Sequence, residues 1–323
     1  MLSFTGTLSL TGEAFVVFVS DKYEYIGKNN ILPKDVISKV DLFIKSLKGK
    51  NLNEEINSID ISEKKKCFLV KITNKRSKSY FEEIGGTLFT KINSFKHINS
   101  IDIFADTLNE KENKFAKSFS EFIFGFNLKS YTFDKYKTVN KNKLNKNIKI
   151  KVITKKKNII ENKYKYYNAV KEGVFLARNL VSEPPNVLNP KTYVQEIKKL
   201  SKHGLQVKIY GEKELKKLGL NALLGVGQGS VNESYLVTIE WKGNKKSKKK
   251  PLTFVGKGVC FDTGGISLKP AKFMEEMKYD MAGSAVVVGL LKSLAIRKAK
   301  VNAVGVVGLV ENMPGGNAQR PGD

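Results

Sequence analysis

LTFVGKGVCFDTGGISLKPAKFMEEMKYD, residues 252–280, is an apolar strand pattern that passes directly into a segment rich in glycine, lysine and aspartate. In an α/β sheet, ligands bind beyond the carboxyl ends of the strands, and this segment is such an end. The glycines let the backbone turn sharply and approach a bound group closely. We therefore place the candidate site among the polar residues Lys257, Asp262, Lys269 and Asp280.

Two chemistries are compatible with these residue types. Carboxylate oxygens bind cations, whereas lysines and backbone N–H groups bind phosphate. The known phosphate loops do not fit, because Phe261 stands where the dinucleotide fingerprint needs its third glycine. A lysine is a poor metal ligand unless its pKa falls by several units, which two adjacent dications could cause. Asp280 alone could also cap the helix that follows it.

The pattern on either side of this segment alternates between strands and helices, which predicts an α/β fold. Strands are expected at 14–20, 66–73, 100–105, 148–154, 205–210, 236–241, 252–256 and 301–307, and helices at 33–48, 112–125, 164–181, 190–202, 212–218 and 281–297. We expect a small N-terminal α/β domain over residues 1–155. An α/β catalytic domain with a mixed, largely parallel sheet is expected over residues 156–323.

Four residues of the first domain have simple local interpretations. Gly85 and Gly86 are expected to form a turn, because paired glycines break regular structure. Asp102 and Asp106 lie near the end of the strand expected at 100–105 with no obvious partner nearby, so we expect both on the surface.

Composition limits the class of protein. The chain has 323 residues, of which 41% are hydrophobic, enough for a large core. Its only cysteines, Cys67 and Cys260, exclude a disulfide scaffold and a cysteine-rich zinc module. Because there are only two histidines, a metal site must depend on carboxylates or unusual ligands. No continuous apolar run approaches the ~18 residues that span a membrane, and no secretory signal is evident. We expect a cytoplasmic protein with no membrane partner.

The net charge of +26 could favour nucleic acid or an anionic membrane surface. However, only four of the 57 basic residues are arginines, the residue that usually contacts bases and phosphates. Lysine also occurs together with many asparagines and isoleucines, as a biased base composition would produce. A basic nucleic-acid-binding protein is therefore kept as the less favoured alternative.

Five stretches resemble, in order, the leucyl aminopeptidase (cytosol aminopeptidase) family. They are ARNLVSEPPNVLNP at 177–190, LGVGQGS at 224–230, VGKGVCFDTGGISLKP at 255–270, MEEMKYDMAGSA at 274–285 and ENMPGGNAQRPGD at 311–323. The resemblance begins near residue 164, and the first ~155 residues match the family only loosely.

The resemblance implies an enzyme that removes N-terminal residues, leucine-like ones preferred, from peptides with a free N-terminus. It implies two divalent metal ions, Mn²⁺ or Zn²⁺, and a homo-hexamer. By position, Lys257 resembles a neutral-lysine metal ligand, Asp262 the carboxylate that bridges both ions, and Asp280 a ligand of the ion that also holds the α-amine. Lys269 resembles the charged lysine that stabilises the oxyanion, and Met277 lines the pocket for the first side chain.

The sequence departs from the family pattern in two respects. Cys260 and Thr263 replace a threonine and a serine, and both small side chains are expected to be tolerated. The family's NTDAEGR motif, which supplies two further metal ligands and an arginine, would lie beyond Asp323. We therefore expect an incomplete sheet, weak metal binding and little activity from these 323 residues alone. A non-catalytic homologue is the further alternative.

Overall fold

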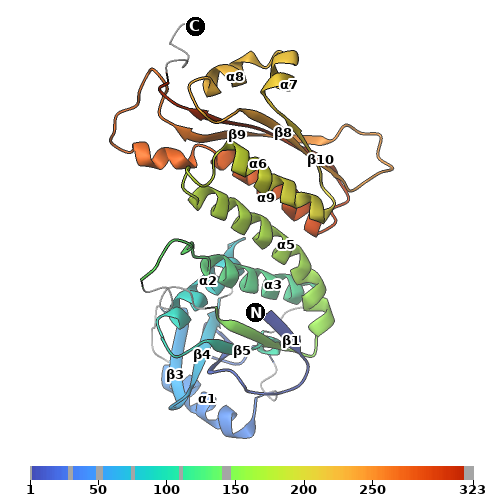
Figure 1. Cartoon of the computed structure of the whole chain (residues 1–323). Helices are drawn as coiled ribbons and strands as arrows, with labels where there is room; N and C mark the ends of the chain where they lie inside the picture. The colour runs from blue at the N-terminus through green and yellow to red at the C-terminus, as the bar shows by residue number, and fades with distance from the viewer. Residues whose placement is uncertain are drawn as a thin grey trace. The chain divides into compact units, whose positions relative to one another are not determined.

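The computed structural model of the chain folds as two compact units, Met1–Asn168 and Ala169–Asp323 (Figure 1). The residues that it describes are 2–27, 32–48, 54–73, 77–108, 112–139 and 147–315. Helix α5 (Lys157–Ser182) contributes its first part to one unit and its second part to the other. It begins seven residues before the helix expected at 164–181. The predicted α/β class is confirmed.

The N-terminal unit contains a largely parallel sheet in the strand order β1-β6-β5-β2-β4-β3. Its strands are β1 (Leu2–Thr5), β2 (Ala14–Ser20), β3 (Ile56–Ser62), β4 (Lys65–Ile72), β5 (Ser100–Phe104) and β6 (Lys149–Ile153). Only β3 and β4 pair in antiparallel fashion among these strands.

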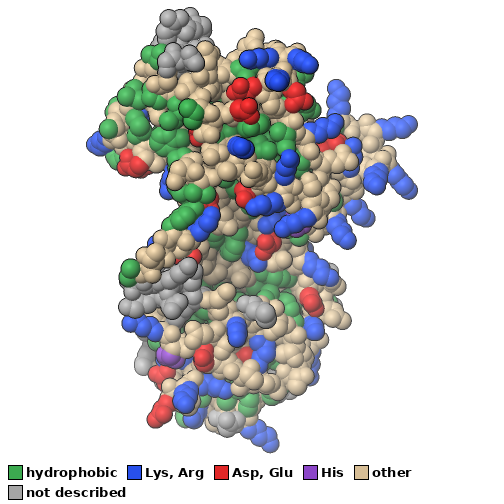
Figure 2. Space-filling model, in the orientation of Figure 1, with side chains coloured by type: hydrophobic (Ala, Val, Ile, Leu, Met, Phe, Trp, Pro, Cys, Tyr) green, Lys and Arg blue, Asp and Glu red, His purple; other side chains and the backbone are tan. Residues whose placement is uncertain are grey.

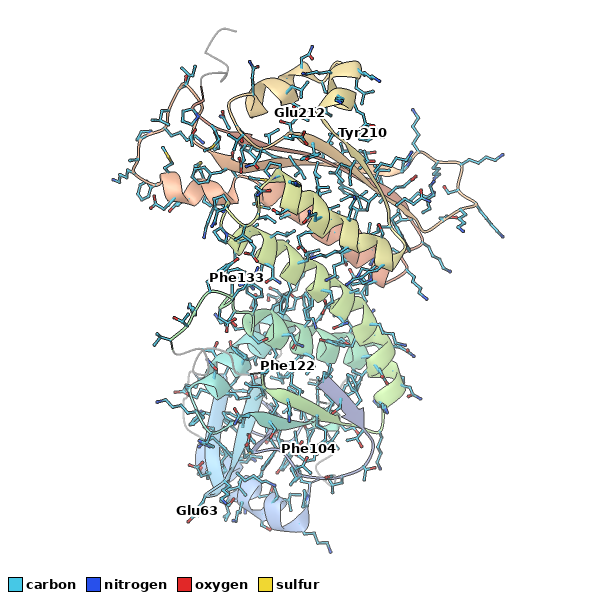
Figure 3. The ribbon with its side chains drawn as sticks, in the orientation of Figure 1. Glu63, Phe104, Phe122, Phe133, Tyr210 and Glu212 are labelled. Atoms are coloured by element: carbon cyan, nitrogen blue, oxygen red, sulfur yellow. The ribbon has the colours of Figure 1, made fainter. Side chains whose placement is uncertain are left out.

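Helices cover both faces of this sheet. α1 (Lys34–Leu47) packs against one face of β2, whose residues Phe15 and Val17 are fully buried. α3 (Glu112–Lys129) packs on the other face, where the rings of Phe18 and Phe122 lie 5.2 Å apart. Figure 3 labels Phe122 on this helix. A strand buried on both faces is apolar without alternation, which explains the sequence AFVVFVS of β2.

The turn expected at Gly85 and Gly86 is wrong, because both residues lie inside helix α2 (Tyr80–Asn93). α2 and α3 cross with their backbones almost in contact. A Cβ atom on Gly85 would lie 2.0 Å from the carbonyl oxygen of Phe122, and one on Gly125 would lie 1.9 Å from that of Glu82. These glycines therefore permit a close helix crossing instead of a chain reversal.

The surface position expected for Asp102 is also wrong, whereas Asp106 is half-buried. Asp102 is 1% exposed, accepts a hydrogen bond from the backbone N–H of Gly12 and lies 3.1 Å from the Nζ of Lys151. Asp106 accepts a hydrogen bond from the hydroxyl of Thr154. The parallel pairing of β5 with β6 makes Asp102 and Lys151 direct neighbours, although they are far apart in the sequence.

The C-terminal unit contains a mixed sheet in the order β7-β8-β10-β9. Its strands are β7 (Gln206–Tyr210), β8 (Tyr235–Lys242), β9 (Leu252–Asp262) and β10 (Asn302–Asn312). Around them lie α6 (Pro190–Lys198), α7 (Glu212–Lys217), α8 (Asn221–Gly227), the short 3₁₀ helix η3 (Met274–Tyr279) and α9 (Ala282–Ile296).

The described part of this sheet has fewer parallel pairs than expected. β9 and β10 are parallel, because α9 connects them as a crossover helix, whereas β8 is antiparallel to both of its neighbours. The loop at 243–251 reverses the chain, so β8 must run against β9. The mixed α/β character is as predicted, and β9 and β10 each extend five residues or more beyond their predicted ends.

Helix α9 forms the centre of the C-terminal core. Ala285 and Leu291 are fully buried against the sheet, and Gly289 contacts Gly173 of α5 backbone to backbone. Among the described residues one segment, Met274–Ile296, is long and apolar enough to cross a membrane, and the prediction from uninterrupted runs missed it. Its packing against β9 and β10 accounts for this composition within a folded core.

The two adjacent glycines of α2 provide a test of the helix crossing. Gly85→Ala should lower the free energy of unfolding by about 1–3 kcal/mol, because the added methyl group overlaps the backbone of α3. Gly86→Ala is the matched control. A Cβ at Gly86 makes only ordinary contacts, with the side chain of Lys129 at 3.6 Å and the carbonyl oxygen of Gly125 at 3.7 Å, so this variant should gain roughly 0.5–1 kcal/mol from helix propensity. Urea unfolding measures both, and equal stability of the two variants would contradict the crossing.

Candidate functional site

Close backbone packing brings the two parts of the candidate site together. A Cβ atom on Gly256 of β9 would lie 2.6 Å from the Cα of Ser284, so only glycine lets the start of α9 rest on this strand. A Cβ atom on Gly258 would likewise lie 2.4 Å from the carbonyl oxygen of Gly308 on β10. The segment that precedes α9 therefore lies beside the residues of β9 that follow Gly256.

The first ion pair joins Lys257 to Asp280. The Nζ of Lys257 donates a hydrogen bond to Oδ1 of Asp280 over 2.6 Å. Oδ2 of the same carboxylate is buried and has no hydrogen-bond partner among the residues that the structure describes. Asp280 is the C-cap residue that follows η3, and Met281 occupies the N-cap position of α9, so the capping role considered for Asp280 is not observed.

The second ion pair joins Lys269 to Asp262 at the carboxyl end of β9. The Nζ of Lys269 lies 2.7 Å from Oδ2 of Asp262 and 3.1 Å from the sulfur of Met277. A tight turn makes this contact possible, because Gly264 and Gly265 have φ values of +90° and +67°. The N–H of Lys269 closes the turn by donating to the carbonyl oxygen of Thr263 over 2.9 Å.

The other oxygen of Asp262 is held by two neutral donors. The backbone N–H of Gly264 donates to Oδ1 over 2.9 Å, and the amide Nδ2 of Asn312 donates to it over 2.7 Å. Burial raises the pKa of Asp262. The hydrogen bonds from Lys269, Gly264 and Asn312, together with the charge of Lys269, outweigh burial and hold the pKa below its usual value. Asp262 is therefore ionised at neutral pH.

All five residues singled out from the sequence lie in the described part of the chain. The structure places Lys257 against Asp280, and Lys269 against both Asp262 and Met277. It brings no three acidic, histidine or cysteine side chains together as a metal-binding group within the described ranges. Residues 316–323, which include the end of the ENMPGGNAQRPGD stretch, lie outside those ranges.

Asn312 is the site residue that sequence reasoning missed. The strand expected at 301–307 ended too early to reach it, whereas β10 continues to Asn312, directly opposite Asp262. A strand of full length would have placed the two residues at the same edge of the sheet.

The donor set fits a divalent cation in one respect. Each carboxylate already faces a positive charge, and Oδ2 of Asp280 is a buried oxygen left without a donor. Hard divalent cations take such oxygens as ligands. Three candidate ligands, Lys257, Asp262 and Asp280, are fewer than a pair of dications needs, so further donors would have to complete the site.

Cys260 lies between Lys257 and Asp262 in the sequence but packs inside the core. It is 1% exposed, and burial, with a smaller effect from the charge of Glu311, raises the pKa of its thiol. A protonated and covered thiol does not act as a nucleophile or a metal ligand.

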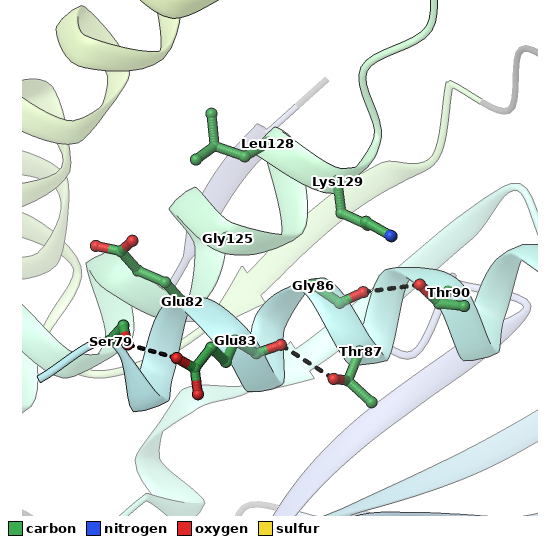
Figure 4. A pocket seen from close by; sticks show the side chains of 9 residues that line it. All are labelled: Ser79, Glu82, Glu83, Gly86, Thr87, Thr90, Gly125, Leu128 and Lys129. Atoms are coloured by element: carbon green, nitrogen blue, oxygen red, sulfur yellow. Dashed lines mark hydrogen bonds between the residues drawn. The ribbon is translucent and has the colours of Figure 1, made fainter. Parts of the chain in front are cut away.

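A separate groove of about 560 Å³ lies on helices α2 and α3 of the N-terminal unit (Figure 4). Its hydroxyl groups already have partners within α2. Ser79 donates to the carboxylate of Glu83, Thr87 to the carbonyl oxygen of Glu83, and Thr90 to that of Gly86. The charged side chains of Glu82 and Lys129 also line the groove, and none of the residues singled out from the sequence as site residues does.

Basic side chains occur on both units in the view of Figure 2. The loop that connects β8 to β9 carries a dense group, with exposed lysines at 245, 246, 248, 249 and 250. The positive charge is thus not confined to this loop, and the nucleic-acid alternative gains no specific support.

Comparison with known proteins gives consistent matches. Residues 175–323 match the sequence model described as the cytosol aminopeptidase family, catalytic domain. A probable cytosol aminopeptidase from Brucella anthropi is 49% identical over 246 residues, which are 75% of this chain and 48% of that protein. Another from Caulobacter vibrioides is 51% identical over 209 residues, 64% of this chain and 42% of that protein. The chain spans about half the length of these curated relatives.

Solved structures share the fold at low sequence identity. A mutant of tomato leucine aminopeptidase has a TM-score of 0.78 and 23% identity, covering all of this chain and 65% of that one. The bottromycin maturation enzyme BotP in complex with Mn has a TM-score of 0.71 and 22% identity, covering 97% of this chain and 62% of that one. These likenesses concern the fold, whereas the sequence matches concern the family. Residues 175–323 of the chain are therefore similar in sequence to the catalytic domain of the cytosol aminopeptidase family.

Proposed function

We propose that the protein carrying this chain is a cytoplasmic, metal-dependent aminopeptidase that releases leucine-like N-terminal residues from peptides. The proposal includes two divalent ions per complete site, Mn²⁺ or Zn²⁺, and a homo-hexamer. The single observation that carries it is the pairing of Asp262 and Asp280 with lysines where β9 ends and α9 begins. The family match over residues 175–323 supports the same activity.

In this proposal, Asp262, Asp280 and the amine of Lys257 hold the metal ions. When bound, the ions supply Lewis acidity at the scissile carbonyl. Oδ2 of Asp280 is the natural first contact, because it is buried and lacks a donor in the described structure. Lys257 becomes a ligand only if it gives up both its proton and its hydrogen bond to Asp280.

Lys269 acts on the substrate. Its ammonium group lies at the end of a short turn, next to Asp262, where a peptide carbonyl at the site would develop negative charge. A fixed positive charge at that point stabilises the oxyanion more than the ground-state carbonyl. The contact of Lys269 with Met277 places an apolar side chain beside it, as a pocket for an apolar first residue requires.

Selectivity for free N-termini provides the first test. The protein that carries this chain should release leucine from Leu-Gly and should leave N-acetyl-Leu-Gly intact, because an acetylated amine cannot contact the site. Asp262→Asn should lower kcat/KM for Leu-Gly by about 100-fold or more, since it removes a charged ligand. Amino-acid release measured by chromatography reports both effects.

Asp21→Asn is the control for this substitution. Asp21 is exposed in a turn of the N-terminal unit, so its variant should keep the activity of the natural protein. Cleavage of the blocked peptide, or undiminished activity of a folded Asp262→Asn variant, would contradict the proposal.

The role of Lys269 has its own test. Lys269→Met should lower kcat for Leu-Gly by about 10²–10³ with a smaller change in KM, because the charge acts mainly on the transition state. Lys272→Met is the control from the same loop. Lys272 lies over the ring of Phe273 at 5.1 Å and should contribute little to kcat. Steady-state kinetics separate the two variants, and equal losses of kcat in both would argue against an oxyanion role for Lys269.

The 323 residues expressed alone should behave differently from a relative of full length. With only three candidate ligands, the isolated chain should bind Mn²⁺ weakly and release leucine at less than about a hundredth of the rate of the Brucella anthropi protein. Calorimetric titration with Mn²⁺ and the dipeptide assay measure this. Comparable rates for the two proteins would show that the three ligands suffice.

A further inference from the structure

We propose that Asn312 is the positioning residue for Asp262. Its side-chain amide fixes the carboxylate so that Oδ1 is reserved for hydrogen bonds and Oδ2 is presented to a cation. This inference rests on the proposed function, because it concerns how one of the proposed metal ligands is oriented.

A bulge in β9 creates the contact. Val259 of β9 pairs with Val310 of β10, and the next pair is Asp262 with Asn312. The step from one pair to the next is therefore three residues on β9 but only two on β10. Without the extra residue, the register would place Phe261 opposite Asn312 and move Asp262 one position farther along. Such bulges turn a side chain in a new direction and are frequent next to active sites.

The two oxygens of Asp262 then have different surroundings. Oδ1 accepts from the amide of Asn312 over 2.7 Å and from the N–H of Gly264 over 2.9 Å, so two neutral donors occupy its two lone-pair directions. Oδ2 accepts only from the Nζ of Lys269 among the hydrogen bonds described for this carboxylate. The Lys269 side chain is 36% exposed and can rotate away, so Oδ2 is the oxygen that a cation can reach.

Asn312 is itself held from two sides. Its backbone carbonyl oxygen accepts hydrogen bonds from the backbone N–H and the hydroxyl of Thr263, over 2.9 and 2.8 Å. A Cβ atom on Gly265 would lie 2.7 Å from Oδ1 of Asn312, so the glycine leaves room for the amide.

The preceding residue anchors the end of β10 as well. The carboxylate of Glu311 is buried and accepts hydrogen bonds from the hydroxyl of Ser230 and the amide of Asn232, over 2.7 and 2.8 Å. The loop that follows α8, which includes the end of the LGVGQGS stretch, thus fixes the strand that carries Asn312 through these hydrogen bonds. An amide held on a fixed strand can orient a carboxylate, as the hydrogen-bonding partners of metal ligands commonly do.

The test compares two asparagines at opposite ends of β10. Asn312→Leu keeps the approximate shape of the side chain and removes its donor. Asn302→Leu is the matched control, because Asn302 also makes a side-chain hydrogen bond, to the carbonyl oxygen of Asn244 over 2.9 Å, but far from Asp262 along the strand. Mn²⁺ binding to the protein that carries this chain is measured by electron paramagnetic resonance of free Mn²⁺. Thermal unfolding is measured in parallel.

Asn312→Leu should raise the Kd for Mn²⁺ by about 10-fold or more, and added Mn²⁺ should restore much of its activity on Leu-Gly. Asn302→Leu should bind Mn²⁺ like the unmodified protein, even if both variants unfold at a similarly reduced temperature. A purely structural role would lower stability without selectively weakening Mn²⁺ binding. If Asn312→Leu does not fold, Asn312→Ser removes the same donor with less added apolar bulk.

A folded Asn312→Leu or Asn312→Ser variant with unchanged Mn²⁺ affinity would overturn the inference. The Asp262→Asn variant separates failure of the positioning role of Asn312 from failure of the proposed ligand role of Asp262. If it weakens Mn²⁺ binding while the Asn312 variants do not, the positioning role alone is wrong. If Asp262→Asn also leaves Mn²⁺ binding unchanged, the ligand role in the proposed function is wrong as well.

Discussion

The parallel pairing of β9 with β10 is the constraint on which the candidate site depends. It places the carboxyl ends of two strands side by side, and the bulge before Asp262 aligns that carboxylate with Asn312. The tight turn that follows returns Lys269 to the same carboxylate. One strand end therefore gathers an acid, an amide and an ammonium group from three points in the sequence.

Glycines transmit this constraint to the rest of the C-terminal unit. Gly256 lets the start of α9 lie against β9, and Gly289 lets α9 lie against α5. Since Asp280 immediately precedes α9, the packing of this helix determines where the second carboxylate lies relative to Lys257. Because α9 is held by close backbone contacts on two sides, it can keep the carboxylate of Asp280 in place without a rigid loop.

Sequence reasoning succeeded where the signal is local. Strand β2 and helix α1 follow directly from apolar patterns and lie within one residue of their predicted ends. It failed where a distant segment changes the meaning of a residue. Gly85 looks like a turn until α3 is known to cross it, and Asp102 looks exposed until β6 places Lys151 beside it. Asn312 was missed for the same reason, because only strand pairing makes it a neighbour of Asp262.

The central claim is that Asp262 and Asp280 present oxygens to divalent ions at the end of β9. The most direct test is anomalous X-ray diffraction at the zinc edge, on crystals of the protein that carries this chain grown with Zn²⁺. The account predicts anomalous peaks about 2.0–2.2 Å from Oδ2 of Asp262 and from a carboxylate oxygen of Asp280. Ordered zinc found only elsewhere, with both aspartates still paired to their lysines, would contradict it.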